Sequence, residues 1–313
     1  MEKKMSSLNL TIIKRILYKT QLLKAHNPNH KLIKLLLLID SGGMRGIVSM
    51  GNCLGLEKLE LTEVFDDIVT ISAGTANGGF FLAKQSALAC TVYTDDLVDR
   101  RFINPLRFWK VTDIDYVNDI VFRHVKKLDT EAIRKSRPNF FACVTRVDDG
   151  NGEFMDVKKQ VDIISVIKAS MAMLVLYNKP IKIGNNYYVD GLTSMGLPID
   201  EIIDQFSPTD ILVLLNRPLG YCRPKLSVIE KSISKLYLRK FPQALKNSFF
   251  DMNRKYSHQI NTLRECGNNY RGVNIGIIHP DYEAIKRTTK NRDLLLQAAQ
   301  KAEQDIYNIL GKR

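Results

Sequence analysis

The chain alternates short, continuous apolar runs with longer stretches in which apolar residues recur at helical spacing. The first run covers residues 34–39, and an unbroken run of this length is typical of a parallel strand that is buried on both faces. A glycine-rich loop follows, and apolar residues from Ile47 to Leu54 then recur as on one face of a helix. The pattern repeats with a predicted strand at residues 68–71 and a predicted helix directly after Ser72.

The same order of strands and helices continues to the end of the chain. Helices are predicted at residues 161–172 and 294–310, and further strands at residues 140–147, 187–189, 211–215 and 273–278. An alternation of this kind predicts an α/β fold, a three-layer α/β/α sandwich with a mostly parallel central sheet. We find no internal repeat or linker that would divide residues 31–313, so this part is expected to form one domain.

Two segments differ from this pattern. Residues 1–30 carry an amphipathic helix, expected at residues 8–24, and Glu2 is their only acidic residue. This basic arm is expected to pack on the edge of the domain or to contact a membrane surface. Residues 217–272 are rich in Lys, Arg and aromatic residues and lie between two predicted strands. We expect them to form a helical cap or lid.

The composition restricts the partners only in part. The chain has 46 Lys and Arg against 33 Asp and Glu, which gives a formal net charge of +13. A basic surface attracts nucleic acid, anionic membranes and acidic proteins alike, so the charge alone identifies no partner. The five cysteines are far apart and form no C-x-x-C pair, which argues against a disulfide framework and a zinc site. No metal and no cofactor are expected.

The sequence contains no targeting signal that we can identify. The N-terminus has no uninterrupted apolar region of the kind that a signal peptide needs. The longest apolar run, residues 35–39, is much shorter than the roughly 20 residues of a membrane span. We therefore expect a cytoplasmic or peripheral membrane protein, although signal-less export would leave no trace in the sequence.

Three motifs carry candidate chemistry, and the first is the loop D-S-G-G-M-R-G at residues 40–46. Glycines at this position allow backbone N–H groups to point inward at the N-terminus of a helix, where negative charge is favoured. Such a loop can bind a phosphate or stabilise the oxyanion of an acyl-transfer reaction. It is not a Walker loop, because Lys-Ser or Lys-Thr does not follow the glycine.

The second and third motifs also follow predicted strands. In T-I-S-A-G at residues 70–74, small residues follow Ser72, as a nucleophile elbow requires at its sharp turn. Asp190 follows an apolar strand and precedes Gly191. Asp-Gly alone is a common turn dipeptide, but here it accompanies the other two motifs.

In this order the motifs resemble those of the patatin-like phospholipase family. Its loop D-G-G-G-x-R-G resembles residues 40–46, its G-x-S-x-G resembles residues 70–74, and its D-G-G/A resembles residues 190–192. The segment I-K-A-S at residues 167–170 resembles the helix end that precedes the family's aspartate, and Pro180 matches its proline. The similarity spans roughly residues 34–215.

The resemblance implies a phospholipase A or lipid esterase with a catalytic Ser–Asp dyad. Ser72 would attack the ester carbonyl of a phospholipid or neutral lipid, and Asp190 would act as general base, through an acyl-enzyme intermediate. The backbone around Gly42, Gly43 and Met44, with Arg45 nearby, would stabilise the oxyanion. The basic surface would contact anionic membrane, each nearby Lys or Arg contributing about 1 kcal/mol. The oligomeric state is open.

The sequence departs from the family pattern at four positions. Ser41 replaces the first loop glycine, Leu192 replaces a small residue, and Leu174 replaces a proline. Thr70 replaces the first glycine of the elbow, and its β-branched side chain is expected to crowd the turn.

Other functions fit parts of the sequence. An α/β-hydrolase triad could combine Ser72 and Asp190 with either His258 or His279, although that fold usually places more strands before its nucleophile. Alternatively, the chain could be a degenerate relative that binds a membrane or a protein. Binding of nucleic acid is not expected, because no recognised motif accompanies the basic residues 217–256.

Overall fold

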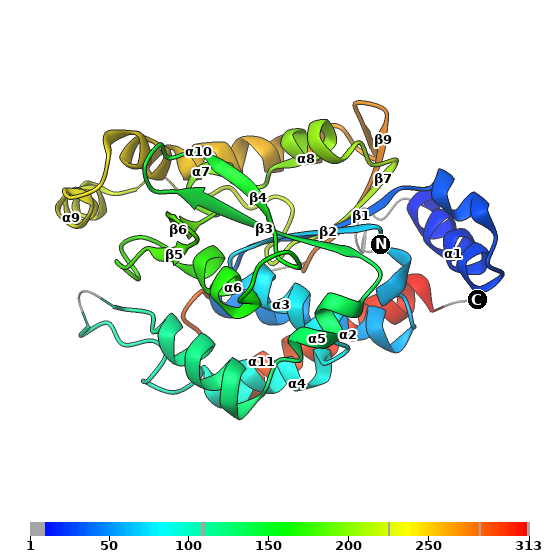
Figure 1. The fold of residues 1–313 in the computed structure, drawn as a ribbon, viewed down its shortest axis with the longest axis horizontal. Coiled ribbons are helices and arrows are strands. Elements are labelled where there is room, and N and C mark those ends of the chain that lie inside the picture. The colour runs from blue at the N-terminus through cyan, green and yellow to red at the C-terminus, as the bar shows by residue number, and fades with distance from the viewer. Residues whose placement is uncertain (1–9, 108–109, 225, 282, 312–313) are drawn as a thin grey trace.

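The computed structural model describes residues 10–107, 110–224, 226–281 and 283–311 of the chain. In these residues the strands form one nine-stranded sheet in the order β5-β6-β3-β2-β1-β7-β9-β8, with β4 paired to β3 (Figure 1). The strands are β1 (Leu35–Ile39), β2 (Asp67–Ile71), β3 (Asn139–Arg146), β4 (Gly152–Asp156), β5 (Ile181–Ile183), β6 (Asn186–Asp190), β7 (Asp210–Leu214), β8 (Asn269–Tyr270) and β9 (Val273–Ile278).

The centre of the sheet is parallel. Strands β3, β2, β1, β7 and β9 run in the same direction, whereas β4, β5, β6 and β8 join antiparallel. All six strands predicted from apolar runs are present. The short strands β4, β5 and β8 lie at or near the edges and carry exposed residues, so they lack the continuous apolar run that identified the others.

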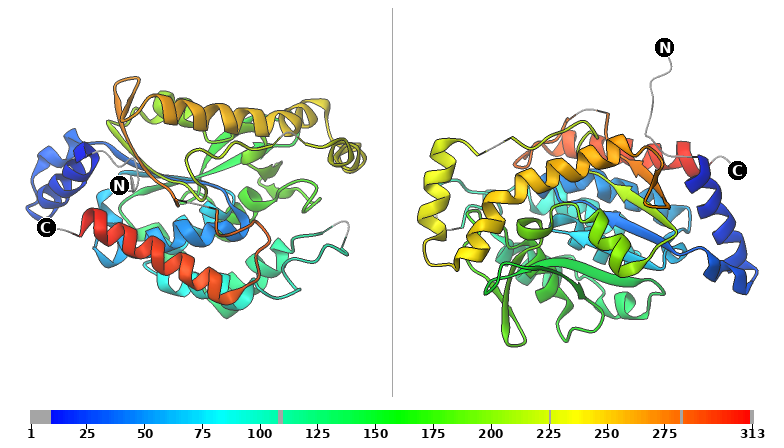
Figure 2. Two further views of the ribbon diagram at one scale, coloured as in Figure 1. Left: turned by 180° about the vertical axis from the view of Figure 1, so that it is seen from behind. Right: turned by 90° about the horizontal axis from the view of Figure 1, so that it is seen from above.

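Helices cover both faces of the sheet, which confirms the three-layer α/β/α fold. Helices α7, α8 and α10 lie on one face, and α2 to α6 and α11 lie on the other (Figures 1 and 2). The α-helices are α1 (Leu10–Lys24), α2 (Gly46–Lys58), α3 (Ala73–Leu82), α4 (Ser86–Thr91), α5 (Thr130–Lys135), α6 (Ile163–Met171), α7 (Leu192–Met195), α8 (Ile199–Phe206), α9 (Val228–Leu238), α10 (Gln243–Glu265) and α11 (Arg292–Leu310).

Shorter helical segments connect these elements. The 3-10 helices are η1 (Pro28–Leu32), η2 (Gly43–Arg45) and η3 (Thr62–Val64), and the π-helices are η4 (Val92–Asp96) and η5 (Tyr116–Val125).

The core explains why β1 is apolar at every position. Leu35, Leu37 and Ile39 belong to the cluster beneath α2, α3 and α11, whereas Leu36 and Leu38 belong to the cluster on the α10 side. Successive side chains of a strand point to opposite faces, so a strand covered by helices on both faces must be apolar throughout.

Helix α1 packs on the edge of the domain. Ile12 and Ile16 are fully buried, and the cations on the same helix are used in ion pairs: Lys19 with Asp66, and Arg15 with Asp210 at 2.5 Å. The predicted helix at residues 8–24 is thus present as α1, while residues 1–9 of the basic arm lie outside the described residues. Membrane contact by this arm stays a prediction.

The segment 217–272 contains α9 and α10, and the short strand β8 lies near its end. Helix α10 packs against α7, and Leu238, Leu245 and Phe249 form a buried cluster of their own with Leu174. Helix α9 instead projects at one end of the molecule (Figure 1). That this segment acts as a lid stays a prediction.

Candidate active site

The glycine loop and the serine elbow meet at the carboxyl ends of β1 and β2, which are neighbouring parallel strands. A Cβ atom added to Gly74 would lie 2.5 Å from the carbonyl oxygen of Ile39 and 2.8 Å from that of Asp40. Only glycine therefore allows the helix after Ser72 to approach the end of β1 this closely.

Ser72 occupies a strained backbone conformation between β2 and α3. Its φ is +55° and its ψ is −124°, values that cost a non-glycine residue free energy and that persist only where the surroundings impose them. This geometry is that of a nucleophile elbow, in which the sharp turn lifts the serine hydroxyl out of the chain. The residue as a whole is half-buried.

The register of β3 brings Asp190 next to Ser72. Strand β2 pairs with β3 as far as Ile71 opposite Cys143, and β6 pairs with β3 from Asp190 opposite Val144. Strand β4 pairs with residues 141–145 of β3 and occupies its other side, so β2 and β6 lie on the same side of β3 and meet end to end. This arrangement places the residue after Ile71 beside Asp190. The Ser72 hydroxyl is accordingly near enough to lower the pKa of the Asp190 carboxyl.

Burial dominates the chemistry of Asp190. Its exposed fraction is 0%, and this burial raises the pKa of its carboxyl to about 7. Interactions with Ser72, with the N–H of Leu192 and with the Arg223 guanidinium lower the pKa but do not offset burial. The N–H of Leu192 donates to Oδ1 at 2.9 Å, whereas Oδ2 has no hydrogen-bond partner among the described residues. A carboxyl with a pKa near 7 is suited to accept a proton at neutral pH.

None of the five histidines, all of which lie in the described residues, hydrogen-bonds to Asp190. His258 is exposed on α10. His279 has its Nδ1 at 3.0 Å from the carbonyl oxygen of Pro280. It lines a cavity that neither Ser72 nor Asp190 borders. The geometry therefore gives no support to a Ser–Asp–His triad.

Of the four loop residues expected at the oxyanion, two have their N–H groups engaged. The N–H of Met44 donates to the carbonyl of Arg287, and that of Arg45 donates to the carbonyl of Gly42, both at 3.2 Å. In the described part of the chain, no acceptor is found for the N–H groups of Gly42 and Gly43. Gly43 has a φ of +58°, which favours glycine. Gly42 and Gly43 therefore remain the two candidates whose N–H groups could stabilise an oxyanion.

The side chain of Arg45 forms an ion pair with Glu283. Its Nε lies 2.7 Å from Oε1 of Glu283, and its Nη2 also contacts that oxygen. Arg45 is 9% exposed. Its charge is therefore paired with a carboxylate at the outer side of the loop.

A polar network beneath the elbow was not predicted. The hydroxyl of Ser170 donates to the carbonyl of Cys143 at 2.8 Å and accepts the N–H of Ser72 at 3.1 Å. The Thr75 hydroxyl lies 2.8 Å from it. The resemblance of residues 167–170 to a family motif pointed to Ser170, but only the fold shows that it binds the backbone N–H of Ser72.

Thr70 does not crowd the elbow as expected. Its hydroxyl donates to the carbonyl of Phe141 at 3.0 Å and lies 3.1 Å from the hydroxyl of Thr75. A Cβ atom on Gly78 would lie only 2.8 Å from Cγ2 of Thr70. The glycine on α3 thus makes room for the branched side chain of Thr70.

The other three departures also have a place in the structure. Leu192 is 4% exposed in the core between the sheet and α10, and Leu174 packs in the cluster formed with α9 and α10. The Ser41 hydroxyl accepts a hydrogen bond from Nη2 of Arg223 at 3.1 Å. Each side chain therefore has a contact that the family's smaller residue or proline would not make.

A small apolar cavity lies behind the elbow. Its volume is about 30 Å³, and it reaches from the glycine loop to the two π-helices. Its lining residues are apolar apart from Asn77 and the Tyr93 hydroxyl: Gly43, Ala73, Ala76, Asn77, Phe80, Ala89, Val92, Tyr93, Leu97, Phe102, Val117, Phe122 and Met171. Because Gly43 and Ala73 border it, this cavity is the apolar space next to the candidate nucleophile.

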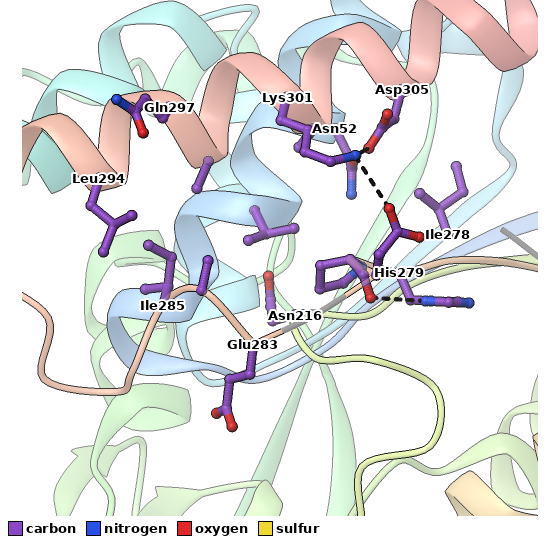
Figure 3. A pocket seen from close by; sticks show the side chains of 16 residues that line it. Asn52, Asn216, Ile278, His279, Glu283, Ile285, Leu294, Gln297, Lys301 and Asp305 are labelled. Atoms are coloured by element: carbon purple, nitrogen blue, oxygen red, sulfur yellow. Dashed lines mark hydrogen bonds and ion pairs between the residues drawn. The ribbon is translucent and has the colours of Figure 1, made fainter. Parts of the chain in front are cut away.

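A larger cavity of about 250 Å³ lies elsewhere, between α2, α11 and residues 279–285 (Figure 3). Asn52 of α2 faces Lys301 and Asp305 of α11 across it. Neither Ser72 nor Asp190 borders this cavity. Its size alone does not make it the active site, since the strained serine and the buried carboxyl lie apart from it.

Two absences concern the described residues only. No group of three or more His, Cys, Asp or Glu side chains in them could hold a metal ion. Nor does any helix within them combine the length and apolar character that crossing a membrane requires.

Comparison with known proteins finds similar sequences and structures. The uncharacterized protein YjjU of Escherichia coli (strain K12) is 27% identical over 185 residues, which cover 58% of this chain and 51% of YjjU. The chain thus spans about half the length of this curated relative. Among solved structures, VipD from Legionella pneumophila aligns with a TM-score of 0.44 and 13% identity, over 89% of this chain and 67% of VipD.

The family itself is identified from sequence. The pattern of the patatin-like phospholipase family matches residues 37–203, more than half of the chain. The matched range includes the glycine loop, Ser72 and Asp190, and it ends within α8. The chain therefore belongs to the patatin-like phospholipase family.

Proposed function

We propose that this protein is a lipid acyl hydrolase in which Ser72 is the nucleophile and Asp190 the general base. The observation that carries the proposal is the junction of β2 and β6 along β3, which brings a strained serine next to a fully buried carboxyl. The pKa of about 7 for that carboxyl is matched to proton transfer at neutral pH.

The proposed reaction proceeds in two halves. Ser72 Oγ attacks the ester carbonyl while Asp190 accepts its proton, and the N–H groups of Gly42 and Gly43 stabilise the oxyanion. The intermediate collapses, the proton passes from Asp190 to the leaving alcohol, and the acyl group remains on Ser72. Water, deprotonated by Asp190, then attacks the acyl carbon. The bond to Ser72 Oγ breaks, the fatty acid leaves, and Asp190 returns the proton to Ser72 Oγ.

The apolar cavity behind the elbow supports an acyl ester as the substrate. It begins at Gly43 and Ala73, so a chain bound there would present its carbonyl to Ser72 and the loop. Its volume of about 30 Å³ is that of roughly one water molecule in the liquid, so a long chain requires the cavity to widen. Short-chain esters are therefore the substrates to test first.

Substitution of both histidines tests the dyad against a triad. His258→Ala and His279→Ala, alone and together, are expected to leave kcat/KM for nitrophenyl butyrate within about threefold of the wild type, because neither ring contacts Asp190. A triad would lose several orders of magnitude. The measurement is ester hydrolysis at pH 8 with matched thermal melts. A wild type that is folded yet inactive on nitrophenyl butyrate and on phospholipid vesicles would contradict the proposal and favour a degenerate binding protein.

Helix α9 supports docking on anionic membrane. Val228, Ile229, Ile233 and Leu236 are exposed by 80, 72, 45 and 62%, although large apolar side chains are usually covered. The cations Lys231, Lys235, Arg239 and Lys240 are exposed on or just after the helix, and Glu230 is the acidic residue among them. A helix with exposed apolar residues and a net positive charge fits the surface of an anionic bilayer.

Removing the apolar residues of α9 should weaken this docking. The double variant Ile229→Ser/Leu236→Ser is expected to weaken binding to phosphatidylglycerol vesicles in co-sedimentation by at least about 10-fold. Full burial of the two side chains would contribute about 3–6 kcal/mol, and about 1.4 kcal/mol corresponds to a factor of 10, so partial burial is sufficient. Val161→Ser, at a residue that is 99% exposed elsewhere, is the matched control. Equal binding of the wild type to neutral and anionic vesicles would argue against the role of the lysines.

A further inference from the structure

Three arginines surround the glycine loop at the carboxyl end of the sheet. Arg217 follows β7 and is 6% exposed. Arg223 reaches the loop from the segment before α9, where its Nη2 donates to Ser41 Oγ at 3.1 Å. Arg287 lies against Gly43, because a Cβ atom on this glycine would be 2.9 Å from Cγ of the arginine. Cations from three distant segments thus converge beside the candidate oxyanion site.

The charges of these arginines are not neutralised. Within the described residues, none of the three forms an ion pair with a carboxylate. Nε and Nη1 of Arg217 and Nε of Arg223 are buried without a hydrogen-bond partner. Arg217 is buried, Arg223 is half-buried and Arg287 is exposed. An arginine as deeply buried as Arg217 is almost always paired, because removing a cation from water is costly. Arg45, on the same loop, follows this rule through Glu283.

The neighbouring groups compensate for this charge only in part. Asp40 is buried close by and attracts both Arg217 and Arg223, but its Oδ2 accepts the hydroxyl of Tyr256 at 2.8 Å and its Oδ1 accepts the N–H of Ser41 at 2.6 Å, so this single carboxylate forms no ion pair with any of the three cations. The guanidinium of Arg223 lies 4.0 Å from the Tyr256 ring centroid, and that of Arg217 lies 5.7 Å from it. The rings support the cations without supplying an anion.

Arg217 and Arg223 are close enough to repel each other. Burial, and next the charge of Arg217, lower the pKa of Arg223 to about 10, whereas for Arg217 the opposing effect of burial is outweighed by Tyr256 and Asp40, which raise its pKa. Both groups remain cations at neutral pH. The N–H groups without a hydrogen-bond partner would be satisfied by a ligand that is anionic and has several acceptor oxygens.

We infer that Arg217 and Arg223, with Arg287 at the rim, form a binding subsite for a phosphate group carried by the substrate. A phosphodiester keeps its negative charge at all working pH values, and its oxygens match the fork of N–H donors on a guanidinium. This inference rests on the proposed ester hydrolysis and adds to it a preference for phospholipid over neutral lipid. In a glycerophospholipid the phosphate is only a few bonds from the ester carbonyl, which suits a subsite beside Gly42 and Gly43.

The test compares two substrates that differ only in the phosphocholine head group. Dihexanoyl phosphatidylcholine and dihexanoylglycerol, used as monomers, avoid any contribution from membrane docking. The ratio of their kcat/KM values, phospholipid over neutral, is expected to fall by about 10- to 100-fold in Arg217→Gln, the range for losing hydrogen bonds to a charged group. Arg223→Gln, at a half-buried residue, should lower the ratio in the same direction and serves if Arg217→Gln folds poorly. Arg264→Gln, at an exposed arginine of α10, is the matched control.

An unchanged ratio in both variants overturns the inference, and so does an equal fall in Arg264→Gln, which would indicate a general effect of surface charge. A second measurement separates a lipid phosphate from free phosphate. If inorganic phosphate raises the melting temperature of the wild type but not of Arg217→Gln, while the substrate ratio does not depend on Arg217, the subsite takes free phosphate and the head-group assignment is wrong.

Inactivity towards both substrates would overturn the proposed function but not this subsite. In that case, stabilisation by glycerol 3-phosphate that is lost in Arg217→Gln supports the phosphate site. Equal melting temperatures with and without glycerol 3-phosphate reject it.

Discussion

Ser72→Ala is expected to reduce ester hydrolysis by about 10⁴-fold or more, since removal of a nucleophile leaves only binding and oxyanion stabilisation. The fold should persist, because the backbone N–H of residue 72 still donates to Ser170 Oγ and its carbonyl still accepts the N–H of Thr75 at 2.8 Å. The measurement is release of nitrophenol from nitrophenyl butyrate, with a thermal melt to establish that the variant is folded.

Ser136→Ala is the matched control for this variant. Ser136 is also half-buried, but it precedes β3 and so lies near the amino ends of the parallel strands, whereas Ser72 lies at their carboxyl ends. Its Oγ donates to the carbonyl of Ile133 at 2.7 Å. Wild-type activity is expected for Ser136→Ala. If Ser72→Ala retained more than a few per cent of the activity, Ser72 could not be the nucleophile.

Asp190→Asn is expected to lower kcat by about 10²- to 10⁴-fold, the usual contribution of a general base. The amide is similar in size to the carboxyl and can still accept the N–H of Leu192, but it cannot take the proton of Ser72. Together with Ser72→Ala, this variant tests whether the two groups act as one unit, since the double variant should then be little worse than Ser72→Ala alone. Additive losses would contradict a shared step.

The pH dependence follows from the same carboxyl. Because the base must be ionised, kcat/KM of the wild type should rise as the pH increases through about 7 and then level off. Stability should change in the opposite direction. The folded state holds the proton of Asp190 more tightly than the unfolded state, so this contribution is complete below the ordinary pKa of 3.8 and is lost as the pH rises through 7.

Thermal melts can detect this change in stability. Asp190→Asn has no charge to bury, so its melting temperature should exceed that of the wild type at pH 8 by more than it does at pH 4. A difference between the two proteins that does not vary with pH would indicate that Asp190 is ionised at its ordinary pKa in the folded state. In that case the pH profile of kcat/KM should have its midpoint well below 7.

Much of the fold could be predicted from local pattern. The continuous apolar runs in β1 and β7 arise because these strands are covered on both faces, so each run identifies a buried strand by itself, and β2 and β9 are apolar at most positions for the same reason. Strands β5 and β8 were missed because edge strands of two or three residues, partly exposed, have no comparable pattern.

The candidate site could be predicted only in part. The elbow and the Asp-Gly turn can be recognised from residue types that are neighbours in the chain. The structure shows why each glycine is required: Gly74 lies against Ile39, and a Cβ atom on Gly191 would lie 2.3 Å from the carbonyl of Cys143. The sequence therefore pointed to Ser72 and Asp190. It could not indicate that Met44 uses its N–H on Arg287, because that contact joins distant segments.

The sequence by itself determined which residues could react, since motif, glycine spacing and strand pattern are local properties. Only the tertiary structure decided what surrounds them. The pairing of β2 and β6 on β3 sets the distance between Ser72 and Asp190, and burial raises the pKa of Asp190 to about 7. The convergence of Arg217 and Arg223 on the loop likewise depends on long-range packing. Desolvation and charge proximity are properties of neighbours in space, and for these residues the neighbours in space are far apart in the sequence.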